Sequence, residues 1–325
     1  MSSVLPIAVD AMGGDRAPDE IVAAAHQAAA AGIAVALVGP SDLAGVGDLP
    51  LFEASEVIAM DDDPAQGVRR KKDSTLVRAA EAVRDGRASA MISAGNTGAT
   101  MAAALLRMGR IRGVSRPAIA TPLPVPGHTP NILLDAGANA EVQPEWLVQF
   151  AQMGSVYARH RFGVERPRVG LLSIGEEPGK GDTLRKEAYD LLAAATNIDF
   201  IGNVEGRDML LKTADVVVTD GFTGNVVLKT LEGGVKVLMK AVFAAFTSDR
   251  ANQPHVDALL PSLLPLVEQM SPDTYGGAML LGVDGVCIIS HGSSNATAML
   301  NGIKVAREMV DHDVVSQLRA AIAGG

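Results

Sequence analysis

The stretch AMISAGNTGA, residues 90–99, decides the fold expected for this chain. Its first three residues form a short apolar run that is typical of a buried strand. A glycine-containing G-x-T-G turn follows at once, and residues 97–111 are predicted to be helical. A strand, a tight turn and a helix in succession form the repeating unit of a parallel α/β sheet.

The same turn occurs a second time, in TDGFTGN at residues 219–225, again directly after an apolar run. A third polar turn, HGSSN at residues 291–295, follows the run at 286–290. Parallel sheets bind ligands at the carboxyl ends of their strands, and the N-terminus of the next helix favours an anion. We therefore expect these turns to form one crevice that binds phosphate. The alternative is that their polar residues only cap helices.

The rest of the chain continues this alternation of strands and helices. Strands are expected at residues 5–9, 33–38, 57–59, 88–92, 118–120, 132–134, 169–174, 198–201, 216–218 and 286–289, with helices between most of them. This pattern predicts a three-layer α/β/α fold with a mostly parallel sheet. No low-complexity linker divides the chain, so residues 1–325 are interpreted as a single domain. Residues 241–277 are expected to form a helical protrusion within it.

Composition and charge limit the compartment and the partners. The chain has 325 residues, of which 48% are hydrophobic and 3% aromatic, and a single cysteine that cannot form an internal disulfide. The absence of a signal peptide and of any run of about 18 apolar residues predicts a cytoplasmic protein. A net charge of −9 argues against nucleic-acid binding.

The charge is unevenly distributed along the chain. Residues 69–116 carry eleven Lys and Arg against three Asp and Glu, a local net charge of +8. A basic segment on an acidic protein indicates an acidic partner or an anionic ligand, although a solvated basic face is an equal alternative.

The sequence does not match several known cofactor-binding and catalytic motifs. The loop GEEPGKGD would need glycine at Ile174 and a hydroxyl residue at Gly181 to be a nucleotide P-loop. No G-x-G-x-x-G pattern follows a strand. The six histidines are scattered, and Asp61-Asp62-Asp63 is most simply a solvated loop. Cys287 lies in an apolar strand, where a thiol is usually a core residue. We therefore expect no metal, no cofactor and no covalent intermediate.

An ordered set of motifs resembles a known family. It consists of DAMGGD (10–15), RRKK (69–72), SAGNTGA (93–99), DAGAN (135–139), GNVEGRD (202–208), TDGFTGN with LKT (219–225 and 228–230), YGG (275–277) and HGSS (291–294). The set covers nearly the whole chain and is similar to the bacterial PlsX family of phosphate acyltransferases.

The resemblance implies a reaction and a cellular setting. The family converts long-chain acyl-[acyl-carrier protein] and inorganic phosphate into acyl phosphate and free carrier protein. The acyl phosphate then feeds the acylation of glycerol 3-phosphate by a membrane acyltransferase in phospholipid synthesis. The fold is similar to that of phosphotransacetylases and of isocitrate and isopropylmalate dehydrogenases. Members are cytoplasmic homodimers that contact the membrane peripherally.

This chemistry needs no side-chain nucleophile, because phosphate itself attacks the thioester. The residues predicted to bind phosphate are Asn96, Thr97, Gly98, Thr223, Gly224 and Ser293. Asn225 and Lys229, one helical turn apart, are expected to support catalysis from the same helix face. Either Lys180 or His291 is expected to polarise the thioester carbonyl or to protonate the departing thiolate.

Two surfaces are predicted to bind partners. The first, for the acidic carrier protein, consists of Arg107, Arg110, Arg112 and Arg116. The second, for the membrane, consists of Leu259, Leu260, Leu263 and Leu264. Pro261 and Pro265 interrupt this second stretch, so a kinked pair of helices or a helix–turn–helix is expected. The same apolar pattern would suit a dimer interface or ordinary core, which is the alternative. Residues 251–277 contain no Lys or Arg, so any membrane contact here would rest on apolar insertion.

Two further functions remain open at this point. A phosphotransacetylase that acts on acyl-coenzyme A would share the fold and the phosphate attack. A non-catalytic protein that binds phosphate or lipid could use the same scaffold. A dehydrogenase is the least favoured, because its cofactor and metal signals are absent.

Overall fold

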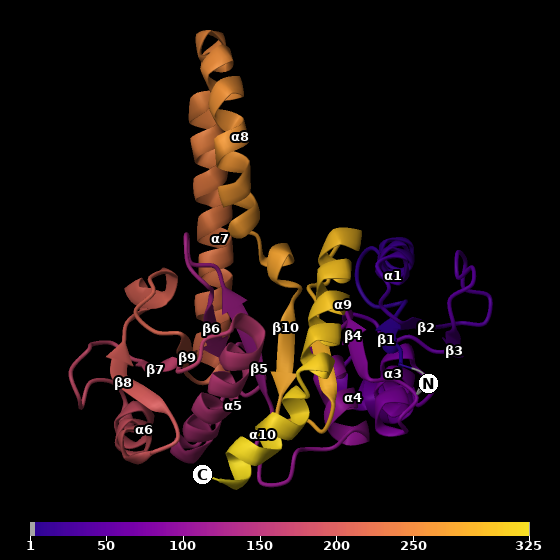
Figure 1. Cartoon of the computed structure of the whole chain (residues 1–325), viewed down its shortest axis with the longest axis horizontal. Coiled ribbons are helices and arrows are strands. Elements are labelled where there is room, and N and C mark those ends of the chain that lie inside the picture. The colour runs from indigo at the N-terminus through magenta and orange to yellow at the C-terminus, as the bar shows by residue number, and fades with distance from the viewer. Residues whose placement is uncertain (1–3, 325) are drawn as a thin grey trace.

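A computed structural model describes residues 4–324, which form one continuous sheet covered by helices on both faces (Figure 1). The strands are β1 (Ile7–Asp10), β2 (Val35–Gly39), β3 (Leu51–Glu53), β4 (Ala90–Ser93), β5 (Ala118–Leu123), β6 (Asn131–Leu134), β7 (Arg168–Leu172), β8 (Asp199–Val204), β9 (Val216–Val218), β10 (Ala278–Leu281) and β11 (Val286–Ile289). The α-helices are α1 (Asp19–Ala30), α2 (Pro64–Arg70), α3 (Thr75–Arg84), α4 (Thr97–Arg107), α5 (Pro144–Phe162), α6 (Thr183–Ala194), α7 (Gly221–Phe246), α8 (Gln253–Gln269), α9 (Ala296–Asp311) and α10 (Val314–Ala323). Short 3-10 turns are η1 (Gly206–Leu210), η2 (Arg250–Asn252) and η3 (Pro272–Tyr275).

The strand order is β3-β2-β1-β4-β11-β10-β5-β6-β9-β7-β8. The first five strands in this order are parallel to one another, and so are the last four. Between them, β10 is antiparallel to both β11 and β5, and β5 is antiparallel to β6. The three reversals make the two parallel halves run in opposite directions. Their carboxyl ends therefore lie at opposite edges of the sheet.

The expected α/β/α fold with a mostly parallel sheet is confirmed, with two differences in the strands. The expected strand at residues 57–59 is wrong, because the third strand forms earlier, at β3, where it pairs with β2. The strand β10 was not expected, and it joins the two halves of the sheet. No helix follows β10 before β11, so the run AMLL lacks the strand–turn–helix pattern from which other strands were predicted.

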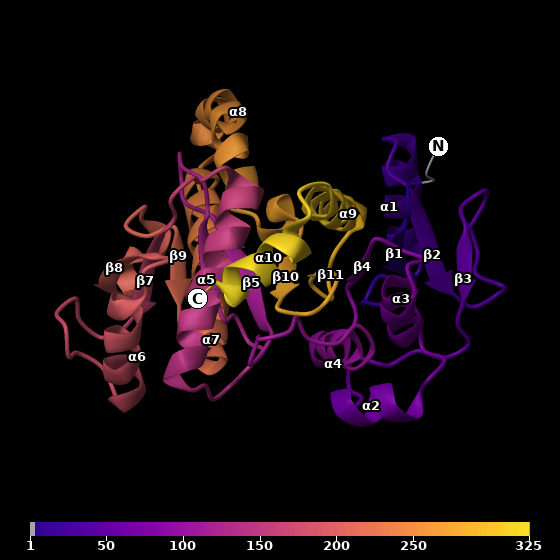
Figure 2. The same ribbon diagram turned by 60° about the horizontal axis from the view of Figure 1, so that its bottom comes forward.

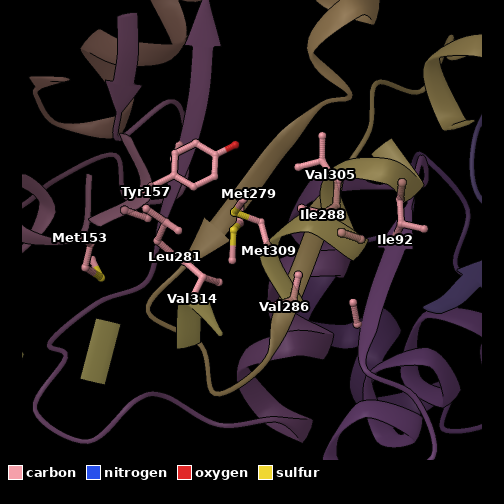
Figure 3. Packing of buried hydrophobic residues seen from close by; sticks show 14 of the residues in the cluster. Ile92, Met153, Tyr157, Met279, Leu281, Val286, Ile288, Val305, Met309 and Val314 are labelled. Atoms are coloured by element: carbon pink, nitrogen blue, oxygen red, sulfur yellow. The ribbon is translucent and has the colours of Figure 1, made fainter. Parts of the chain in front are cut away.

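The core consists of two layers of aliphatic side chains, one on each face of the sheet. One face is covered by α1, α9, α10, α5 and α6, and the other by α3, α4 and the beginning of α7. Figure 3 shows how Met309 from α9 and Val314 from α10 approach Leu281 of β10, beside Tyr157 of α5. Few aromatic residues take part, so close packing of Val, Ile, Leu, Met and Ala fills the interior.

The helices α7 and α8 form a hairpin that projects away from the sheet (Figures 1 and 2). Only Gly221 and Gly224 of α7 are buried, and no described residue of α8 is. The kinked pair expected from Pro261 and Pro265 is wrong, because α8 runs through both prolines as one helix. The two prolines are four residues apart on an exposed face, where water can bond the carbonyls they leave free. Among residues 4–324, no helix combines the length and hydropathy needed to cross a bilayer.

Candidate functional site

The carboxyl ends of β1, β4 and β11 bring three loops into contact, and we call residues 10–15, 93–98 and 290–294 the first-turn site. The Asp15 N–H donates to the Gly292 carbonyl over 2.8 Å. A Cβ atom on Gly14 would lie 3.0 Å from the same carbonyl and 3.1 Å from the side chain of Ala94. Gly14 also has a φ of 104°, a conformation that favours glycine. The first and third polar turns predicted from the sequence are therefore neighbours.

Asn96 joins the start of α4 to the loop before α2. Its side-chain oxygen accepts from the Ala99 N–H at 3.0 Å and caps the helix, while its amide nitrogen donates to the Met60 carbonyl at 3.0 Å. Gly98 lies so close to α2 that a Cβ atom there would meet Pro64 at 2.7 Å. Because the cap is uncharged and α4 offers no acceptor to its first N–H groups, the N-terminus can receive an anion.

His291 and Ser293 form a small hydrogen-bonded unit on the exposed side of this site. The Ser293 N–H donates to Nδ1 of His291 at 3.2 Å, and the Ser293 hydroxyl lies 2.8 Å from the same nitrogen. A backbone N–H can only donate, so Nδ1 must accept and the proton of the neutral ring sits on Nε2. The expected role of Ser293 in holding phosphate thus competes with its bond to the imidazole.

The second G-x-T-G turn, residues 219–225, lies at the end of β9, and its polar side chains form hydrogen bonds within the protein. Asp220 caps α7 by accepting from the Thr223 N–H at 2.8 Å. The Arg185 guanidinium pairs with Asp220 and donates to the hydroxyls of Thr219 and Thr223, each at 3.1 Å. Burial opposes ionisation of Asp220, but bonds from Thr223 and the charge of Arg185 hold its pKa below the usual value.

The two G-x-T-G turns do not meet within one chain, so the described residues of one copy do not form the single shared crevice that was expected. Four strands lie between β4 and β9, which places those strands about 24 Å apart. Their carboxyl ends also point to opposite edges of the sheet. The sequence could not reveal this, because the separation depends on the antiparallel strands β10 and β5.

Three of the predicted catalytic residues lie at the edge of the second turn. Asn225 is exposed and lies beside Gly137, which follows β6. Lys229 forms an ion pair with Glu232, with Nζ 2.8 Å from the carboxylate. Lys180 lies on an exposed loop after β7. Of the two residues left open for polarising the thioester, only His291 adjoins the first-turn site.

The predicted docking arginines lie at the C-terminal end of α4, which Arg107 ends and the other three follow. Because α4 has eleven residues, this end is about 16 Å from Asn96. Arg107 lies 3.7 Å from Glu81, and Arg110 bonds the carbonyl of Ser115. Arg116 stacks on the ring of Trp146 at 5.1 Å. Arg110, Arg112 and Arg116 are exposed, and Arg107 is half-buried.

The four predicted membrane leucines divide into two pairs. Leu259 and Leu264 are 57% and 47% exposed, whereas Leu260 and Leu263 are half-buried. The prediction therefore remains open for the first pair and is weakened for the second.

Sequence reasoning missed Arg185 and gave no role to Asp135, which together organise the second turn. Asp135 is fully buried and accepts from the N–H groups of Ile119, Ala138 and Asn139 at 2.7 to 3.0 Å. Burial raises its pKa, and these bonds act in the opposite direction. The repeated pattern of an aspartate at a strand end, at Asp10 and Asp135, was the available signal.

The described residues include no group of three or more His, Cys, Asp and Glu side chains arranged for a metal ion. Cys287 is fully buried, and burial raises the pKa of its thiol to about 12.

Solved structures of other proteins share this fold. A phosphotransacetylase from Staphylococcus aureus superposes with a TM-score of 0.59 at 15% identity, covering 94% of each chain. A branched-chain phosphotransacylase from Enterococcus faecalis gives 0.61 at 13% identity, covering 94% of this chain and 99% of the other. A 4-hydroxythreonine-4-phosphate dehydrogenase from Klebsiella pneumoniae superposes with a TM-score of 0.54 at 14% identity, and the match covers 94% of this chain and 99% of the other. The chain has the α/β fold of phosphotransacetylases and of these dehydrogenases.

Sequence comparison is more specific. Residues 5–317 match the family described as fatty acid synthesis protein. The chain is 47% identical to a phosphate acyltransferase from Geobacillus thermodenitrificans, covering 97% of this chain and 98% of that one. It is 52% identical to a phosphate acyltransferase from Elusimicrobium minutum, and the match covers 89% of this chain and 83% of that one. The chain belongs to the phosphate acyltransferase family, as the motifs predicted, and is an acyltransferase of fatty acid and lipid synthesis.

Proposed function

We propose that the protein transfers a long-chain acyl group from the thioester of an acyl-carrier protein to inorganic phosphate. A phosphate oxygen forms a bond to the thioester carbonyl carbon, the carbon–sulfur bond breaks, and the thiolate takes a proton from solvent. The products are acyl phosphate and free carrier thiol, and the acyl phosphate would serve a membrane glycerol 3-phosphate acyltransferase. No covalent enzyme intermediate is needed.

Phosphate binds at the first turn in this proposal. The observation that carries it is the difference between the two helix caps. Uncharged Asn96 caps α4, so the N–H groups of Thr97 and Gly98 face a region without a capping charge. The carboxylate of Asp220 caps α7 and is itself paired with Arg185, which also occupies the hydroxyls of Thr219 and Thr223, so fewer donors are left for an anion there. We assign the second turn a structural role, as the anchor of α7.

His291 is the residue we propose to polarise the thioester. Its Nδ1 accepts from the Ser293 N–H, so its Nε2–H is available to donate to the carbonyl oxygen as negative charge develops. Ser293 then orients the ring. Lys180 is not used in this scheme, because it lies at the other edge of the sheet.

Acyl-carrier proteins are strongly acidic, and we propose that Arg110 and Arg112 attract this donor. Both are exposed, whereas Arg107 is half-buried near Glu81 and Arg116 stacks on Trp146. Reversing Arg110 and Arg112 to Glu should raise the KM for the carrier protein and spare a small acyl thioester. Arg166→Glu, at another exposed arginine, is the matched control. Equal losses on both substrates would contradict docking at this segment.

We propose that a second copy of the chain covers α7. Phe222, Val226 and Val237 fall on one stripe of this helix, at spacings of four and eleven residues, and are 68%, 49% and 69% exposed. A homodimer would bury this stripe. Light scattering should report a dimer for the wild type and a monomer for Val237→Glu, and an unchanged dimer would contradict the assignment.

The exposed leucines of α8 are proposed to contact the membrane through apolar insertion alone, since residues 251–277 have no Lys or Arg. Leu259→Gln with Leu264→Gln should abolish cosedimentation with vesicles of neutral phospholipid. The control Leu191→Gln changes an exposed leucine on α6 and should bind as the wild type does. Equal binding by both variants would contradict this contact.

The reaction is tested with purified protein, long-chain acyl-carrier protein and phosphate. Acyl phosphate is trapped with hydroxylamine, and free carrier thiols are counted. Phosphate-dependent formation of both in equal amounts is expected. Turnover on acyl-coenzyme A alone would contradict the carrier protein as the acyl donor, and turnover on neither substrate would contradict the proposed reaction.

A further inference from the structure

A buried carboxylate lies directly beneath the first turn. Asp10 ends β1 and is 1% exposed. It accepts from the Ser93 hydroxyl at 2.6 Å and from the Met12 N–H at 3.2 Å. The hydroxyl of Thr75 and the backbone N–H of Gly13 are further donors to it. All four neighbours donate, so the arrangement suits the ionised form, even though burial raises the pKa of Asp10.

Ser93 links this carboxylate to the turn. A serine hydroxyl has one proton, and here it points to Asp10. The oxygen lone pairs are then free to accept from the Gly95 N–H at 2.9 Å. The Gly95 amide is thereby turned toward the interior, and the N–H groups of the next residues are left for a ligand.

The three groups are packed without space between them. A Cβ atom on Gly13 would lie 2.6 Å from Asp10 Oδ2, 2.8 Å from the Gly95 nitrogen and 2.8 Å from Ser93 Oγ. The backbone of the loop after β1 therefore closes over the chain of hydrogen bonds from Asp10 to Gly95. A rotation of the Ser93 hydroxyl would break the bond to the turn as well as the bond to Asp10.

We propose that Asp10 is a positioning residue for the acyl transfer, acting through Ser93 to fix the direction of the Gly95 amide. This inference rests on the proposed binding of phosphate at the first turn. Asp10 does not touch phosphate. It holds Ser93 as an acceptor, so that the turn presents the N–H groups of Thr97 and Gly98 in a constant orientation.

Thr75 offers a matched control, because its hydroxyl also donates to Asp10 but is not among the partners of Gly95. Ser93→Ala should raise the phosphate KM about tenfold, the effect of losing one ordered hydrogen bond at a buried amide. The KM for the acyl donor should change less than twofold. Thr75→Val should leave the phosphate KM within twofold, although it also removes a donor from Asp10.

Asp10→Asn should also raise the phosphate KM. The amide nitrogen of asparagine is a hydrogen-bond donor, and it would face neighbours that also donate. The double variant Asp10→Asn with Ser93→Ala should have nearly the same phosphate KM as Ser93→Ala alone, because the two residues act as one unit. Equal rises in Ser93→Ala and Thr75→Val, or an unchanged phosphate KM in Ser93→Ala, would overturn the proposal. If Ser93→Ala does not fold, Ser93→Cys keeps the volume with a weaker hydrogen bond and carries the same expectation.

Phosphate binding measured by calorimetry on the same variants separates this inference from the reaction. A wild type that binds phosphate without turnover would refute the proposed function only. The weaker binding expected in Ser93→Ala, with normal binding in Thr75→Val, would still support the role of Asp10. A wild type that does not bind phosphate would refute both.

Discussion

The fourth residues of the two G-x-T-G turns provide a sharp test of the fold. A Cβ atom on Gly224 would collide with the carbonyl oxygen of Asp135, whereas one on Gly98 would meet the ring of Pro64 at 2.7 Å. The first obstacle is backbone, fixed by the buried carboxylate of the same residue and its hydrogen bonds. The second is a side chain on the short helix α2, which can shift.

The expected magnitudes follow from these contacts. Either substitution by alanine gains up to about 1 kcal/mol of helix propensity, and that gain cancels in the comparison. Gly98→Ala should cost about 0–2 kcal/mol after overpacking is relieved. Gly224→Ala must displace Asp135 and break at least two of its buried bonds, which costs about 3–5 kcal/mol. Free energies of unfolding from urea denaturation, followed by circular dichroism, would measure both. Equal costs, or a larger cost for Gly98→Ala, would refute the reasoning.

Three further predictions concern single side chains. His291→Ala should lower kcat about a hundredfold, which is the usual effect of losing one oxyanion donor. Lys180→Ala should keep kcat within about twofold of the wild type. A larger loss of kcat in Lys180→Ala than in His291→Ala, measured in steady-state assays, would contradict the choice of His291. Cys287, whose pKa is about 12 through burial, should resist a thiol reagent at pH 8 in the native protein and react at once in urea; rapid native labelling would show that the strand opens. Asp73 has its pKa lowered to about 2 by the hydroxyl of Ser55 and by Arg78, so its contribution to stability is present above pH 3.8 and is lost as the pH falls through about 2. The stability difference between wild type and Asp73→Asn should shrink in that window, and a constant difference in melting temperature would contradict this.

Local patterns in the sequence were enough to predict the fold class. The strand, the turn and the start of the helix around Asn96 were placed correctly because each βα unit carries its own signal in apolar runs, glycines and caps. The helix itself ends at Arg107, four residues before the predicted end. A helical protrusion was predicted, but the continuous helix α8 was not. Its two prolines lie on an exposed face, where they are tolerated within the helix. The short strand β10 was not predicted because β11 follows it directly, without the helix that completes a βα unit.

The relation between the two turns was beyond local reasoning. Each turn was located at a strand end, and both were expected to bind phosphate. Their separation depends on β5 and β10, whose antiparallel pairing involves residues far apart in sequence. The partnership of Arg185 with Asp220 is likewise a contact between distant residues, and a lone arginine on a helix gives no sign of it. The site around Asn96 and His291 could be assembled only when the sheet order was known.

The central claim is that phosphate binds at the first turn and that the second turn anchors α7. The matched variants Thr97→Val and Thr223→Val test it most directly, through the phosphate KM and the melting temperature of each. Valine keeps the N–H of Thr97 but removes its exposed hydroxyl, which is predicted to donate a further hydrogen bond to phosphate, so this variant should raise the phosphate KM about fivefold with little change in melting temperature. The hydroxyl of Thr223 bonds Asp220 and Arg185, so its variant should melt at lower temperature with a phosphate KM near that of the wild type. A raised phosphate KM in Thr223→Val beside a normal one in Thr97→Val would contradict the account.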